Sequence, residues 1–79
     1  MTRRVFHLRT ETIDLLQLLK ASGCAMTGGE AQHYVVSGMV SVNGEPESRK
    51  RRKLRAGDSV QLADEIEVFI EAASDDASV

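Results

Sequence analysis

The segment from residue 27 to residue 62 constrains the fold most, because its junctions carry markers of particular local structures. Thr27 and Glu30 have the spacing of a capping box. In that motif the Thr27 hydroxyl accepts from the Glu30 amide, and Glu30 reaches back to the Thr27 amide. Further on, Asn43-Gly44 is the pair best suited to a type I′ turn, since both residues tolerate positive φ. The segment is therefore predicted to run from a helix into a β-hairpin.

A second helix is predicted upstream of this segment. From Glu11 onward the leucines recur with helical spacing. Thr10 or Thr12 can serve as the N-cap, and Gly23 can adopt the left-handed conformation that ends a helix. The connector 24–26 is short, so the two helices should pack together. The inner face of the first helix is expected to hold Leu15, Leu16, Leu18 and Leu19. That of the second is expected to hold Ala31, Tyr34, Val35 and Met39, with Gly38 ending the helix.

Alternating apolar residues predict strands after the second helix and a short edge strand before the first. The expected strands are residues 5–8, 39–42, a return strand through Pro46 to Arg55, 59–62 and 66–70. A turn at residues 56–58 separates the return strand from the strand at 59–62. The predicted fold is therefore α+β, with two packed helices against a small, mostly antiparallel sheet. We expect a single domain over residues 1–71 and an acidic, disordered tail over residues 72–79.

The return strand of the predicted hairpin is strongly basic. Alternation places Leu54 on the core face and, on the opposite face exposed to water, Arg49, Arg51, Lys53 and Arg55. Lys50 and Arg52 share the parity of Leu54, so either they lie beyond the edge of the core or a bulge resets the register. The bases of this run are Arg49, Lys50, Arg51, Arg52, Lys53 and Arg55.

Charge is distributed unevenly along the chain. The formal net charge is −2, yet residues 1–55 hold all ten bases and only five acids, and residues 56–79 hold seven acids and no base. The whole-chain value therefore hides a candidate polyanion site and an acidic end.

The order of these elements resembles the S-four domain, an RNA-binding family with an αL motif. The resemblance rests on Thr27, Glu30-Ala31, Gly38, Val40, Val42-Asn43-Gly44 and Gly57-Asp58-Ser59-Val60, and it covers roughly residues 11–70. The segment Glu47-Ser-Arg-Lys-Arg51 is similar to that of stand-alone bacterial members, the YbcJ-like group. The resemblance implies binding of structured RNA through the two-helix surface and the basic hairpin, with ribosomal RNA as one candidate.

The candidate RNA-binding residues come from both surfaces. Arginine suits phosphate because its planar fork makes two parallel hydrogen bonds. The amides of Gly28 and Gly29 could hold a phosphate at the helix start, although ordinary capping with a loose first turn is the simpler interpretation. The full set is Arg49, Lys50, Arg51, Arg52, Lys53, Arg55, Thr27, Gly28, Gly29, Gln32 and His33.

The remaining residues argue against other functions. Cys24 has no partner for an internal disulfide, and no catalytic, metal or cofactor site is expected, since His7 and His33 lack ligands at suitable spacing. The three aromatics, Phe6, Tyr34 and Phe69, are too few for a single-strand binder. We expect a soluble, cytoplasmic monomer. The alternative function is a protein-interaction module whose basic hairpin docks an acidic partner.

Overall fold

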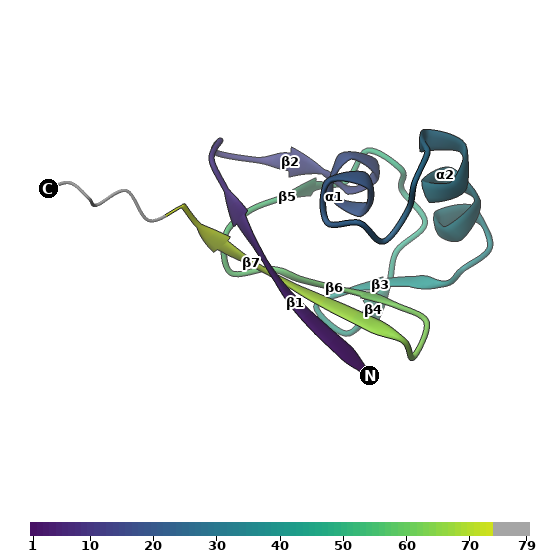
Figure 1. The fold of residues 1–79 in the computed structure, drawn as a ribbon. Coiled ribbons are helices and arrows are strands. Elements are labelled where there is room, and N and C mark those ends of the chain that lie inside the picture. The colour runs from purple at the N-terminus through teal and green to yellow at the C-terminus, as the bar shows by residue number, and fades with distance from the viewer. Residues whose placement is uncertain (74–79) are drawn as a thin grey trace, which may run out of the picture.

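Two helices cover one face of a five-stranded sheet in the computed structural model, which describes residues 1–73 (Figure 1). The sheet order is β1-β7-β6-β3-β4, in which β1 and β7 are parallel and the other neighbours antiparallel. Strands β2 and β5 form a separate antiparallel pair. The elements are β1 (Thr2–Leu8), β2 (Ile13–Asp14), α1 (Leu15–Ala21), α2 (Gly28–Val36), β3 (Val40–Val42), β4 (Glu45–Pro46), β5 (Lys53–Leu54), β6 (Ser59–Leu62) and β7 (Ile66–Ala72). The predicted α+β architecture is confirmed, and the expected short edge strand is β1.

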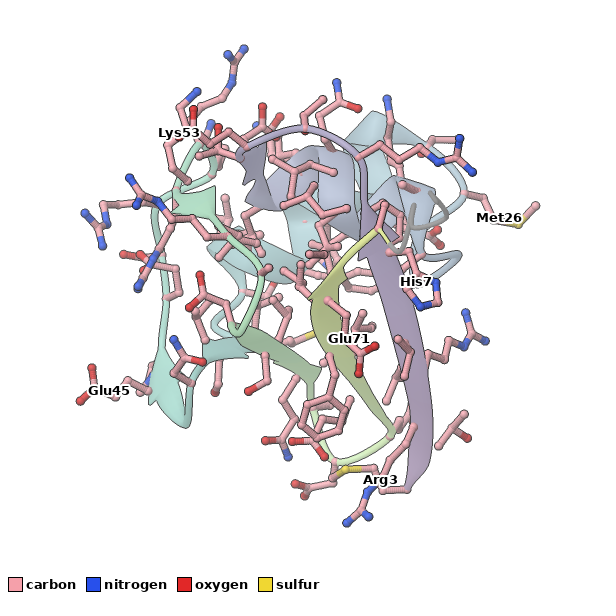
Figure 2. All side chains as sticks on the ribbon, turned by 90° about the vertical axis from the view of Figure 1, so that its left-hand side faces the viewer. Arg3, His7, Met26, Glu45, Lys53 and Glu71 are labelled. Carbon is pink, nitrogen blue, oxygen red and sulfur yellow. The ribbon has the colours of Figure 1, made fainter. Side chains whose placement is uncertain are left out.

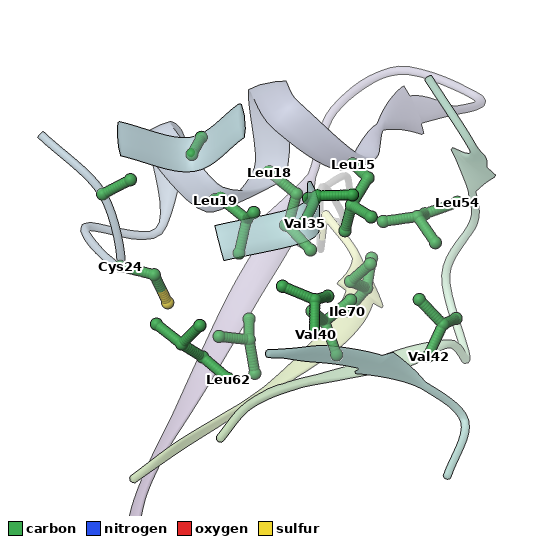
Figure 3. Close-up of a cluster of buried hydrophobic side chains, with 14 of the residues drawn as sticks. Leu15, Leu18, Leu19, Cys24, Val35, Val40, Val42, Leu54, Leu62 and Ile70 are labelled. Carbon is green, nitrogen blue, oxygen red and sulfur yellow. The ribbon is translucent and has the colours of Figure 1, made fainter. Parts of the chain in front are cut away.

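The core lies between the helices and the sheet (Figure 3). Alternate residues of the central strands point toward the helices, as the sequence pattern predicts. The sheet contributes Val40, Val42, Val60, Leu62, Val68 and Ile70, and the helices contribute Leu15, Leu18, Leu19, Ala31 and Val35. Leu54, from the separate β2–β5 pair, is also completely buried. That small pair is thereby anchored in the main core.

Helix α1 begins later than the sequence pattern predicts. Asp14 is its N-cap, and the Asp14 carboxylate accepts from the Gln17 amide at 2.8 Å. The predicted start at Glu11 is wrong, because Ile13 and Asp14 pair with β5. Capping by Thr10 or Thr12 is wrong for the same reason. The end of the helix is as predicted, with Gly23 at φ 84°.

Helix α2 has the predicted N-cap. The Thr27 hydroxyl accepts from the Glu30 amide at 3.1 Å. The reciprocal bond is displaced by one residue, since Glu30 accepts from the Met26 amide at 2.7 Å instead of the Thr27 amide. Met39 follows the helix and is exposed, so its predicted place on the inner face is wrong.

Hydrogen bonds join the turn that follows β3 to the turn that precedes β6. Asn43 and Gly44 have φ values of 53° and 86°, which confirms the positive φ predicted for this turn. The Asn43 side chain donates to Asp58 Oδ1 at 3.1 Å and accepts from the Ser59 amide at 2.9 Å. The Asn-Gly turn therefore also fixes the Gly57-Asp58 turn.

The predicted basic return strand does not form. Only β4 pairs with β3, after which the chain leaves the sheet and rejoins strand structure at β5. The Glu47 amide still donates to the Val40 carbonyl at 2.9 Å, but the Glu47 side chain turns inward and is buried. Lys50 and Arg52 both lie in a loop outside the core, so no bulge is needed to explain their parity with Leu54. We call residues 48–55, which include β5, the basic segment.

The last strand extends further than predicted. β7 includes Ala72, the first residue of the expected tail, which pairs with Leu8. The Ala73 amide donates to the Leu8 carbonyl at 2.9 Å, and residues 74–79 of the expected tail lie outside the described residues. Within residues 1–73, neither helix has the length and apolar character needed to cross a bilayer.

Candidate functional site

The basic segment is attached to the first turn of α1 by its backbone. The Leu15 amide donates to the Arg52 carbonyl at 3.0 Å, and the Leu16 amide donates to the Lys50 carbonyl at 3.3 Å. These are among the amides that a helix start otherwise leaves unsatisfied. The bonds occupy carbonyl oxygens that would repel an anion, and they fix the backbone from which the basic side chains project.

A buried carboxylate organises the inner part of this segment. Glu47 is 6% exposed and accepts four hydrogen bonds, three of them from Arg49. Arg49 donates through its amide at 2.9 Å, Nε at 3.0 Å and Nη2 at 3.1 Å, and Arg52 donates through Nη1 at 2.7 Å. The hydrogen bonds from Arg49, and then from Arg52, lower the pKa of Glu47 from 4.5 to about 2. The carboxylate is therefore ionised throughout the physiological range.

The other four bases of the segment face solvent without an ion-pair partner among residues 1–73. They are Lys50, Arg51, Lys53 and Arg55. Figure 2 shows nitrogen-tipped side chains projecting around Lys53. Residues Ser48 to Lys53 also line an open hollow in the surface. Such a concentration of unpaired like charge is suited to binding a polyanion, which would offset the mutual repulsion.

The predicted residues of α2 do not join this cluster. Thr27, Gly28 and Gly29 follow the carboxyl end of α1, whereas the basic segment contacts its amino end. Figure 2 accordingly draws Met26 and Lys53 on opposite sides of the molecule. The amides of Gly28 and Gly29 have no acceptor among the described residues, and a Cβ at Gly28 would meet no atom within 4 Å. Gln32 and His33 are exposed on the same helix.

Several bases outside the segment are engaged within the fold. Arg3 pairs with Glu67 at 3.5 Å on the sheet face that the helices leave uncovered. Arg4 donates through Nη1 to the Ser22 carbonyl at 2.7 Å, next to Gly23. Nε2 of His7 lies 3.7 Å from Oε1 of Glu71. No group of three potential metal ligands occurs in residues 1–73.

Glu47 is the residue that sequence reasoning missed. The pattern predicts a continuous basic strand, which offers no reason to bury the acid that precedes it. The available signal was an acid two residues before the first of a dense run of bases, a position in which one carboxylate can pair with several guanidinium groups.

Comparison with known proteins agrees with this architecture. Residues 6–70 match the family model of the S4 domain, and the chain belongs to that family. The expected resemblance is thereby confirmed.

Two bacterial relatives share this sequence pattern. The probable ribosome maturation protein RlbA of Bacillus subtilis is 42% identical over 53 residues, which cover 67% of this chain and 75% of RlbA. YbcJ of Escherichia coli is 39% identical over 51 residues, which cover 65% of this chain and 73% of YbcJ. The solution structure of YbcJ, described as revealing an αL motif involved in RNA binding, matches with a TM-score of 0.57 and 30% identity, covering 87% of each chain.

Proposed function

We propose that this protein binds structured RNA, with the basic segment as its main phosphate-contacting surface. The observation that supports this most strongly is a set of four exposed bases that have no ion-pair partner within residues 1–73 and stand on a backbone fixed to α1. Phosphate contacts by lysine and arginine supply most of the affinity in nucleic-acid binding. The relative YbcJ is named a putative RNA-binding protein, and its structure is described as revealing an RNA-binding αL motif, which supports the same class of ligand.

The positions of the aromatic side chains favour recognition of folded RNA over stacking on unpaired bases. Phe6 and Tyr34 are half-buried against the core, and Phe69 lies on the uncovered face of the sheet. No aromatic residue occurs within the basic segment. Stacking of bases on aromatic rings is therefore unavailable there, which favours backbone and shape recognition of paired RNA.

The proposal extends to the class of RNA and to the second surface. We assign ribosomal RNA as the target, because the relative RlbA is named for ribosome maturation. The unpaired amides of Gly28 and Gly29, with Thr27, Gln32 and His33, form a secondary contact for an RNA that reaches around the helices. The protein acts as a monomer and by binding alone, without catalysis.

Competition binding tests this function. A fluorescent RNA stem-loop bound to the protein is displaced with unlabelled stem-loop, duplex DNA of equal length, or polyglutamate, at a fixed salt concentration. We expect the RNA to compete best. Equal competition by the DNA would contradict recognition of structured RNA, and better competition by polyglutamate would support docking of an acidic protein partner instead.

A further inference from the structure

We infer that Glu47 is a positioning residue that holds Arg49 and Arg52 together as a preformed phosphate-binding pair. An acidic side chain then strengthens the binding of an anion. The inference rests on the proposed function of the basic segment and names the residue that arranges it.

The shared acceptor brings the two guanidinium groups together. Nη2 of Arg49 and Nη1 of Arg52 both donate to Oε1 of Glu47, at 3.1 and 2.7 Å. Two like charges meet on one oxygen atom, and the carboxylate offsets the repulsion between them. Without Glu47, we expect the guanidinium groups to separate.

Each arginine keeps donors that can reach a ligand. Arg49 uses Nε and Nη2 for Glu47, so its Nη1 group has no partner within residues 1–73. Its side chain is 72% exposed, and that of Arg52 is 30% exposed. Glu47 can therefore hold both arginines through some of their guanidinium nitrogens while the remaining nitrogens contact phosphate oxygens.

Preorganisation gives the carboxylate its effect on affinity. A free arginine side chain must be immobilised when it binds, whereas one already held in place loses less freedom. For two arginines we expect a change in affinity of about tenfold, equivalent to about 1.4 kcal/mol. Simple charge counting gives the opposite sign, because removing an acid from a basic surface should strengthen the binding of a polyanion.

The variant Glu47→Gln tests these opposite expectations, with Glu45→Gln as its matched control. Glu45 is exposed on β4 and forms no ion pair among the described residues, and both variants remove one negative charge. Affinity for the RNA stem-loop is measured over a range of salt concentrations. We expect Glu47→Gln to bind about tenfold more weakly and with a smaller salt slope, and Glu45→Gln to bind at least as tightly as the wild type. Binding by Glu47→Gln that equals or exceeds that of Glu45→Gln would overturn the inference.

A second pair of variants applies if Glu47→Gln fails to fold. Arg49→Lys keeps the charge but loses the fork that engages Glu47, and Arg51→Lys makes the same change at an exposed arginine without a carboxylate partner. We expect the larger loss of RNA affinity from Arg49→Lys. Equal losses would overturn the inference.

A titration with pyrophosphate separates this inference from the proposed function. The Nε–H resonances of Arg49 and Arg52 are followed by NMR in the wild type and both glutamine variants. Shifts in the wild type and Glu45→Gln, but not in Glu47→Gln, support the anion-binding pair even if the RNA stem-loop fails to bind. Equal shifts in all three proteins would overturn the inference about Glu47. In that case, RNA binding by the wild type would still support the proposed RNA-binding function.

Discussion

The Leu15 amide donates to the Arg52 carbonyl at 3.0 Å, and this bond joins the basic segment to the start of α1. One residue before α1, Asp14 pairs with Lys53 in the small β2–β5 ladder. The neighbouring pair, Ile13 and Leu54, turns its side chains toward the core. The charged surface is therefore supported directly by the apolar interior.

Leu54→Ala should test this dependence. Leu54 is completely buried, and truncation of such a leucine typically costs about 2–5 kcal/mol of unfolding free energy. Urea denaturation followed by circular dichroism measures the change. Met26→Ala is the control, because Met26 is 90% exposed and its truncation should alter stability by under about 0.5 kcal/mol. Similar values for the two variants would show that Leu54 does not anchor the segment.

The link between the two turns predicts a loss of stability in Asn43→Gly. Glycine keeps the positive φ of this position, so the change isolates the side-chain bonds to Asp58 and Ser59. We expect unfolding free energy to fall by about 1–3 kcal/mol. A stability unchanged in Asn43→Gly would mean that these bonds contribute nothing net.

The pKa of Glu47 predicts a specific dependence of stability on pH. Because the folded-state pKa of about 2 lies below the ordinary value of 4.5, the ionised carboxylate stabilises the fold fully above pH 4.5. That contribution is lost as the pH falls from 4.5 toward about 2. The wild type should therefore be more stable than Glu47→Gln at pH 7, and the difference should shrink at pH 3. A difference that stays constant between these two pH values would contradict the assigned pKa.

The start of α2 gives a separate prediction for the secondary contact. Gly28→Ala fits the available space and should stabilise the helix, by up to about 1 kcal/mol. The added Cβ should also obstruct a phosphate that approaches the exposed amides, and weaken RNA binding a few-fold. Thermal unfolding and stem-loop affinity, measured on the same variant, separate the two effects. Greater stability with unchanged affinity would leave Thr27, Gly28 and Gly29 with a capping role alone.

Local rules predicted those parts of the fold whose conformation is set by near neighbours. Thr27 caps α2, Asn43-Gly44 forms the turn, and Val40 and Val42 share a buried face, as their residue types indicate. Non-local pairing explains the errors. The start of α1 depends on β5, a segment about forty residues away in the chain, and its pairing with Ile13 has no local signal.

The candidate site was predicted only in part. The density of bases pointed to residues 49–55, of which residues 49–53 line one open hollow. Their arrangement could not be predicted, because it depends on the buried Glu47 and on helix amides that bind loop carbonyls. Alternation assigned Arg49 to the solvent face, but could not show that its fork is held by a carboxylate.

An NMR titration of the labelled protein with an RNA stem-loop tests the central claim most directly. The account predicts that the largest amide shifts fall in residues 48–55, with smaller ones at Gly28 and Gly29. Arg3 and Phe69, on the uncovered face of the sheet, should remain unchanged at moderate salt. Shifts concentrated at Arg3 and Phe69, with the basic segment unaffected, would contradict the assignment of the RNA-binding surface.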